Sequence, residues 1–161
     1  MKELTLTSKL IILESENELS KEEKMLVEEA RKATSKAYTP YSNFKVGCSV
    51  LLDNGEMVSG GNQENASYPA CICAENVALS AAVSQFPGVG IKALAIATSG
   101  GADEESPVAP CGICRQSILE HQGRSGHPIQ ILLVGGDGTI IKANGIKPLL
   151  PLSFSQKDLL K

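Results

Sequence analysis

Three cysteines in two short motifs have the spacing of zinc ligands. Cys73-Ala74-Glu75 places a thiol two residues before a carboxylate, and Pro110-Cys111-Gly112-Ile113-Cys114 contains a C-x-x-C pair. Three thiolates can occupy three corners of a zinc tetrahedron and leave the fourth corner for water. Zinc lowers the pKa of such a water from about 15.7 to about 7. The motifs therefore predict a zinc site with Cys73, Cys111 and Cys114 as ligands, and with Glu75 as a catalytic group that moves protons without binding the metal.

Both motifs are expected to begin helices, because apolar residues at helical spacing follow them. A helix N-terminus presents free N–H groups and positive potential, which lower the pKa of a nearby thiol. Two alternatives remain open at this stage. The cysteines could form a redox pair, or they could hold a closed structural zinc with Cys71 as the fourth ligand. The structural alternative leaves Glu75 without a role.

Size, charge and cysteine count limit the class of protein. The chain has 161 residues, which fit one domain, and 42% of them are hydrophobic, enough for a core. Its net charge of -3 argues against a nucleic-acid partner. No apolar run reaches membrane-spanning length, and no signal peptide is recognisable. Five cysteines, an odd number that includes a C-x-x-C, favour metal or catalytic use in a reduced cytoplasm.

The periodicity predicts helices alternating with strands. Ser20 and Glu23 form a capping box before a helix that Pro40 ends. Further elements are expected in this order: strand 44–52, a turn at 53–56, a return strand from 57, helix 73–83, strand 91–97, a surface loop 99–109, helix 111–121, strands 129–134 and 139–143, and helical turns at 146–150 and 155–161. This order predicts an α/β fold with a single mixed five-stranded sheet between helices, in three layers. The strands on either side of helix 111–121 should be parallel.

The first 19 residues are expected to form a separate amino-terminal arm, and residues 20–161 the catalytic domain. Leu4 and Leu6 alternate with polar residues, and the apolar run Leu10-Ile11-Ile12-Leu13 follows, which is typical of a strand. The arm is therefore interpreted as a strand or a packing arm at a subunit surface.

From Ala37 to about Leu160 the chain resembles the small, homotetrameric, zinc-dependent cytidine deaminases. The motifs that carry the resemblance appear in the family's order: Ala37-Tyr38-Thr39-Pro40-Tyr41-Ser42-Asn43-Phe44, Gly61-Asn62-Gln63-Glu64-Asn65-Ala66, Cys73-Ala74-Glu75, Pro110-Cys111-Gly112-Ile113-Cys114-Arg115-Gln116, and Leu149-Leu150-Pro151 with Ser153-Phe154. The resemblance implies hydrolytic deamination of cytidine and 2′-deoxycytidine, with release of ammonia, in pyrimidine salvage. It also implies one zinc per chain and a homotetramer.

The resemblance also assigns substrate-binding residues. It implies that Asn62 and Glu64 bind the ribose, that Phe44 packs against the pyrimidine, and that the backbone of Ala74 holds the base. Phe154 would come from a neighbouring subunit. The residues alone leave simpler interpretations open: a polar strand end for Asn62 and Glu64, a core position for Phe44, and a tail pinned to its own core for Phe154.

Two positions depart from the family's pattern. Asn76 stands where the three-cysteine family usually has an arginine that moderates the negative charge on sulfur, and Cys71 stands where a small residue is usual. Asn76 favours a rival hypothesis, a deaminase of another nucleoside-like aminopyrimidine such as a blasticidin-type compound. A second rival, from another functional class, is a non-catalytic zinc-stabilised assembly module.

Overall fold

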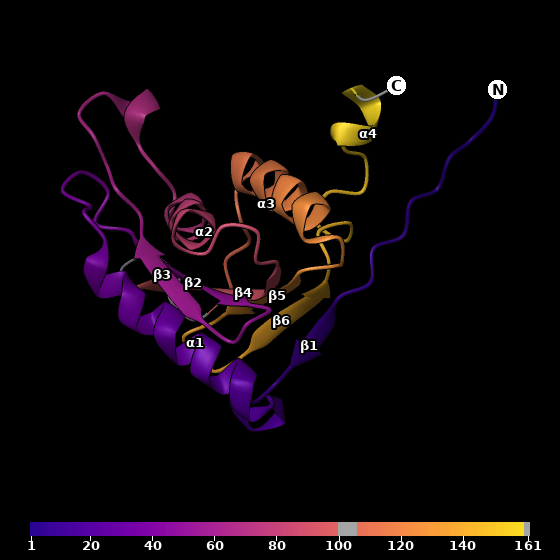
Figure 1. Ribbon diagram of the computed structural model, residues 1–161. Coiled ribbons are helices and arrows are strands. Elements are labelled where there is room, and N and C mark those ends of the chain that lie inside the picture. The colour runs from indigo at the N-terminus through magenta and orange to yellow at the C-terminus, as the bar shows by residue number, and fades with distance from the viewer. Residues whose placement is uncertain (100–105, 160–161) are drawn as a thin grey trace.

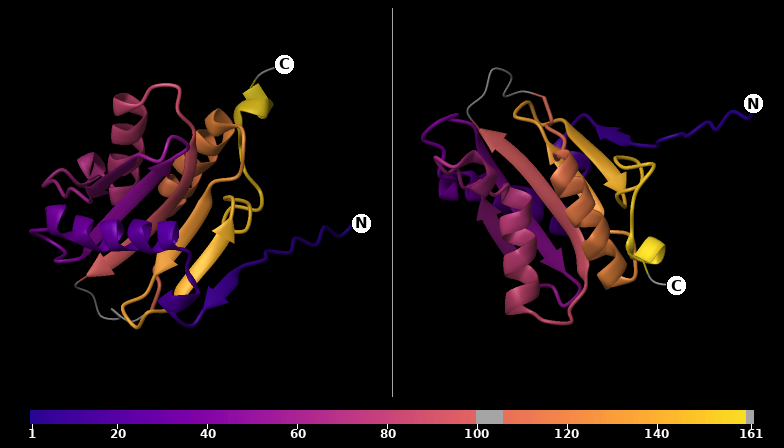
Figure 2. Two further views of the ribbon diagram at one scale, coloured as in Figure 1. Left: turned by 60° about the horizontal axis from the view of Figure 1, so that its bottom comes forward. Right: turned by 90° about the horizontal axis from the view of Figure 1, so that it is seen from above.

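A mixed sheet between two layers of helices forms the body of the molecule (Figures 1 and 2). This computed structural model describes residues 1–99 and 106–159, so most of the loop expected at 99–109 and the last two residues lie outside it. The strands are β1 (Ile11–Leu13), β2 (Lys45–Leu52), β3 (Met57–Gly61), β4 (Ile91–Ser99), β5 (Gln130–Val134) and β6 (Ile140–Asn144). The helices are α1 (Lys21–Ala33), α2 (Ala74–Gln85), α3 (Gly112–Ser125) and α4 (Gln156–Leu159), with short 3-10 turns at Glu16–Glu18, Thr34–Lys36 and Tyr68–Ala70.

The sheet confirms the expected fold class and has one strand more than the five expected. Its strand order is β1-β6-β5-β4-β2-β3. β4 and β5 run parallel, as predicted for the strands on either side of α3, and the other neighbouring pairs are antiparallel. The sixth strand is β1, which pairs Ile11 with Lys142 and Leu13 with Ile140. The count of five missed it because this pairing joins segments almost the whole chain apart.

Helix α1 covers one face of the sheet. The predicted capping box is present: the Ser20 hydroxyl accepts from the Glu23 N–H at 3.3 Å, and the Glu23 carboxylate accepts from the Ser20 N–H at 2.8 Å. Leu26, Val27 and Ala30 of the helix are buried against a second set of buried side chains from the sheet, among them Leu51, Ala93, Ala95, Leu132 and Ile140. This cap and the apolar stripe that follows it explain why the helix begins where it does.

Helices α2 and α3 lie side by side on the opposite face (Figure 2). Their apolar residues pack in one cluster with β2, β4 and β5; its members include Val50, Leu52, Ala78, Leu79, Ala82, Leu94, Ile118 and Ile131. The chain runs from α2 into β4 and from α3 into β5. Because β4 and β5 are parallel, both helices begin near the carboxyl ends of these strands. The N-termini of α2 and α3 therefore meet at the same end of the strands.

The structure also bears on a membrane location. Among the described residues, no helix combines the length and the apolar character that crossing a bilayer would require.

Gly47 of β2 allows α1 to approach the sheet closely. A Cβ at this position would lie 2.1 Å from the Ala30 carbonyl oxygen and 2.6 Å from the Thr34 nitrogen, both backbone atoms of the α1 segment. We expect Gly47→Ala to lower the free energy of unfolding by about 3 kcal/mol, because backbone atoms cannot move aside as a side chain can. Gly123 of α3 is the matched control, since a Cβ there meets nothing within 4 Å. Gly123→Ala should raise stability by about 0.5–1 kcal/mol. Denaturant unfolding of both variants measures this, and equal midpoints would contradict it.

Candidate active site

The N-terminus of α2 presents Cys73 and Glu75. Cys73 is the N-cap residue, and its side chain makes no capping hydrogen bond, so its sulfur remains free for another partner. Ala74 is fully buried and Glu75 is only 4% exposed. A carboxylate this deeply buried in the first turn of a helix is unlike the ordinary exposed acidic residue found there, because desolvation of a charge is costly. This favours a chemical role for Glu75.

The N-terminus of α3 presents the other two thiols. Cys111 is the N-cap residue, and its sulfur accepts from the Cys114 N–H at 3.5 Å. Cys114 is buried, whereas Cys111 is exposed. The side chain of Arg115 holds this turn in place, because it donates to the Pro110 carbonyl at 2.9 Å and to the Leu149 carbonyl at 2.7 Å. The C-x-x-C pair is thus fixed to the segment that follows β6.

The two helix starts bring the three predicted ligands together. The sulfurs of Cys73, Cys111 and Cys114 all lie within 4.8 Å of one another, and those of Cys73 and Cys111 are 3.8 Å apart. Zn–S bonds of about 2.3 Å in tetrahedral geometry separate two sulfurs by about 3.8 Å. The donor set and its spacing therefore fit a zinc ion. Within the described residues, the group contains no fourth thiol, imidazole or carboxylate, which agrees with an open position.

Cys71 does not join this group, although it is close in sequence. Its sulfur accepts from the Asn65 N–H at 3.3 Å and lies 3.7 Å from the Asn65 carbonyl. It lines a pocket of about 320 Å³ together with Tyr41, Ser42, Glu64 and Tyr68. The closed four-cysteine site considered from the sequence is therefore not formed.

Burial and mutual contact set the proton affinities in the cluster. A hydrogen bond from Cys114 lowers the pKa of the Cys73 thiol to about 6. The same contact, with burial, raises the pKa of Cys114 far above its usual value. Burial also raises the pKa of Glu75, and Cys114 partly offsets this. The Asn76 amide lies 3.9 Å from the Cys114 sulfur as a hydrogen-bond donor without charge.

The predicted ribose residues sit on a segment that adjoins Cys73. Gln63 and Ile72 exchange two backbone hydrogen bonds of 2.8 and 2.9 Å, which places 62–64 beside the entry to α2. The Asn62 side chain accepts from the Val46 N–H at 2.8 Å and donates to the Phe44 carbonyl at 3.0 Å. Asn62 thus ties β3 to β2 and positions Phe44, a half-buried residue.

Glu64 organises the loop before Phe44. Its carboxylate accepts from the N–H groups of Tyr41 and Ser42 at 2.9 and 3.3 Å and from the Ser42 hydroxyl. The hydrogen bond from the Ser42 hydroxyl is the main cause that lowers the pKa of Glu64, and the two N–H groups lower it further. Ser42 lies within the motif at 37–44, but the pattern predicted no role for it. Its contact with Glu64 joins positions 22 residues apart and has no signature in the local pattern.

Phe154 lies on the surface of the single chain. Its side chain is 60% exposed, and its carbonyl accepts from the Gln116 amide of α3 at 2.8 Å. Phe154 therefore does not pack into the core of its own chain. A larger hollow of about 470 Å³ between α3 and the C-terminal segment contains none of the predicted site residues.

Comparison with known proteins gives a consistent result. Residues 20–125 match the family model described as the cytidine and deoxycytidylate deaminase zinc-binding region. The cytidine deaminase of Sporosarcina psychrophila is 42% identical over 135 residues, which are 83% of this chain and 92% of that protein. A Mycobacterium tuberculosis cytidine deaminase is 38% identical over 138 residues, covering 84% and 91% of the two chains.

Solved structures agree with the sequence relatives. The crystal structure of cytidine deaminase from Burkholderia pseudomallei matches with a TM-score of 0.71 at 37% identity, over 81% of this chain and 98% of that one. A crystal structure of cytidine deaminase from Mycobacterium tuberculosis matches with a TM-score of 0.62 at 34% identity. With the three-thiol zinc group and the buried Glu75 beside it, these matches show that the chain belongs to the zinc-dependent cytidine deaminase family.

Proposed function

We propose that this protein is a zinc-dependent hydrolase that converts cytidine and 2′-deoxycytidine to uridine and 2′-deoxyuridine and releases ammonia. One observation carries this: three thiols at two helix N-termini form a zinc-sized group with an open fourth position, next to a buried carboxylate. Pyrimidine salvage in the cytoplasm is the setting that fits a reduced thiol cluster. The net charge of -3 supports a free nucleoside substrate over a nucleic acid.

The proposed mechanism assigns the metal to Cys73, Cys111 and Cys114 and the proton transfers to Glu75. Zinc held by these residues would activate a water molecule for attack on C4 of the cytosine ring. The Glu75 carboxylate would accept a proton from this water and pass it to ring N3. It would then accept the proton of the hydroxyl group added at C4 and pass it to the leaving amino group. Its burial, which raises its pKa, helps it to hold a proton between these transfers. The backbone of Ala74, itself fully buried, holds the base against the start of α2.

The remaining predicted residues would bind the rest of the nucleoside. Asn62 and Glu64 would orient the ribose hydroxyls from the segment beside Cys73, and Phe44 would pack against the ring. Both polar side chains already hold the backbone near Phe44. We therefore propose that they position the loop as well as the sugar.

A homotetramer would complete the pocket. In the single chain, large apolar side chains lie exposed near the ends of α2 and α3, namely Tyr68, Ile72, Ile113, Leu152 and Phe154. Exposed apolar groups that gather near a site mark a surface for association. We propose that Phe154 of a neighbouring subunit closes the pocket over the base.

The rival substrate class rests on Asn76. Three thiolates and Zn²⁺ carry a net charge of about −1, and the Asn76 amide donates to Cys114 without adding positive charge. A blasticidin-type aminopyrimidine is thus the second candidate substrate. A deamination screen of free nucleosides and analogues, followed by absorbance, compares the two: cytidine turnover at least equal to that of the analogue supports the first.

Replacement of one ligand should abolish metal binding. We expect the purified protein to contain one zinc per chain and Cys111→Ala to lose it, because two thiolates hold zinc much more weakly than three. Cys71→Ala is the matched control, since Cys71 is exposed and outside the group. Elemental analysis after gel filtration measures the content. Full zinc in Cys111→Ala would remove Cys111 from the ligand set.

Removal of the Glu75 charge should separate chemistry from metal binding. Glu75→Gln keeps the shape of the buried side chain but cannot accept a proton, so turnover should fall by about 10²–10⁴-fold. Zinc content and the midpoint of unfolding should stay close to those of the wild type. Unchanged turnover in a single-cycle assay would exclude Glu75 from the mechanism.

Mixed oligomers can show whether two chains share a site. Phe154→Ala and Glu75→Gln subunits, each nearly inactive alone, should regain part of the activity when they are co-assembled. Some pockets would then receive Glu75 from one chain and Phe154 from its neighbour. No recovery in oligomers proven to be mixed, or a fully active monomer by sedimentation, would rule out the shared site.

A further inference from the structure

The first ten residues extend away from the body of the molecule (Figures 1 and 2). No hydrogen bond or ion pair joins residues 1–9 to the part of the chain that the structure describes. The apolar side chains of this stretch remain in solvent: Leu4 is 73% exposed, and Ile12, in β1, is 65% exposed. Exposed apolar side chains on an extended segment are unfavourable in water, so this segment favours a surface that covers it.

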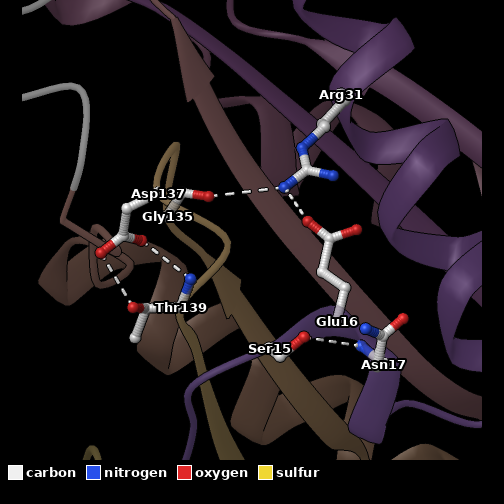
Figure 3. A network of polar contacts seen from close by, with 7 residues as sticks. All are labelled: Ser15, Glu16, Asn17, Arg31, Gly135, Asp137 and Thr139. Carbon is white, nitrogen blue, oxygen red and sulfur yellow. Dashed lines mark hydrogen bonds and ion pairs between the residues drawn. The ribbon is translucent and has the colours of Figure 1, made fainter.

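Residues 11–19, which follow this segment, are anchored to the body of the molecule. β1 pairs with β6, and Ser15 and Glu18 form a second capping box. Glu16 makes an ion pair with Arg31 of α1, and Arg31 also donates to the Gly135 carbonyl at 3.4 Å, at the turn between β5 and β6 (Figure 3). Leu19 is buried in the core under α1. Anchored residues 11–19 therefore fix the point from which the extended segment leaves the molecule.

The segment is self-complementary about Ser8. An antiparallel pairing of two copies centred there sets Lys2 opposite Glu14, Leu4 opposite Ile12, and Leu6 opposite Leu10. These positions are all even, so in a strand they share one face. Apart from the Ser8 pair at the centre, each pair on that face is either apolar with apolar or of opposite charge. Such cross-strand pairs stabilise a sheet. Lys2 and Glu14 have no ion-pair partner among the described residues of their own chain.

We propose that residues 2–14 pair antiparallel with the same residues of a second copy, across a twofold axis at Ser8. β1 stands at the end of the strand order, so one of its backbone edges has no partner. In this register, residues 3–5 of the second copy lie along that edge and extend the sheet. A twofold contact of this kind uses the same surface on both chains, which suits a palindromic pattern.

This contact lies outside the part of the chain that defines the family. The family model begins at residue 20, whereas the arm and β1 precede it. The paired arms contain none of the residues assigned to zinc, proton transfer or nucleoside binding. The arm thus adds an interaction surface for a second copy of this chain, independent of the proposed reaction.

Disulfide trapping tests the register directly. Ser8→Cys places two thiols opposite each other at the axis. Facing residues of antiparallel strands have Cα atoms about 4.5–5.5 Å apart, and disulfides favour Cα separations of about 4.4–6.8 Å. Under mild oxidation of the zinc-loaded protein, most chains should shift to twice the chain mass of 17.0 kDa on a non-reducing gel. Thr5→Cys is the matched control: its two copies would be six residues apart along the strands, about 20 Å. The wild type gives the background from the exposed Cys71 and Cys111.

A second pair of variants guards against unfavourable thiol geometry at the axis. Co-expressed Leu6→Cys and Leu10→Cys chains with tags of different size should yield linked heterodimers, because these positions face each other. If neither this pair nor Ser8→Cys links above the wild-type background, the proposal is overturned. Equal linking by Thr5→Cys would also overturn it, since that result indicates a free arm without register.

Charge exchange tests the outer pair. In the Ser8→Cys background, Lys2→Glu should reduce linking because it places two carboxylates together, and adding Glu14→Lys should restore it. The rescue should weaken as salt is raised, because exposed charges are screened. Loss of linking without rescue would show that Lys2 and Glu14 do not face each other, and the proposed register would be wrong.

Discussion

The parallel pairing of β4 with β5 is the constraint on which the site depends. Each strand is preceded by a helix on the same face of the sheet, so α2 and α3 must begin at the same end of the two strands. The apolar packing of both helices against this sheet then holds their first turns together. Three sulfurs from two separate motifs come within 4.8 Å as a result. If either strand ran in the other direction, the N-terminus of its helix would lie at the opposite end of the strands. Cys73 would then be separated from the C-x-x-C pair.

The electrostatics of the cluster follow from this placement. The two helix N-termini direct positive potential at the thiols, and hydrogen bonding from Cys114 lowers the pKa of Cys73. Burial acts in the opposite direction on Glu75 and raises its pKa. A thiol with a lowered pKa and a carboxyl group with a raised pKa therefore belong to the same short segment of the chain. This contrast suits the proposed roles of metal ligand and proton carrier.

The polar residues around the site hold the backbone in place, beside the substrate role proposed for two of them. Asn62 and Glu64 both hold the chain near Phe44, and Arg115 ties the start of α3 to the carbonyl of Leu149. These contacts hold the segments on either side of the thiols in place. The exposed apolar groups nearby and the projecting arm support the proposals of association between chains. The proposed arm contact would extend the sheet at its β1 edge.

Local chemistry in the sequence determined the ligands, the helix starts and the parallel crossover. The capping box of Ser20, the C-x-x-C spacing and the apolar periodicity act over a few residues, so the pattern alone reveals them. Only the tertiary structure decided that Cys71 contacts Asn65 instead of the zinc group, that Ser42 binds Glu64, and that β1 adds a sixth strand beside β6. The β1–β6 pairing joins residues such as Ile11 and Lys142 from opposite ends of the chain. The other contacts depend on the paths of loops that pack against neighbouring segments. No local spacing encodes such contacts, because they form only when the core has brought their segments together.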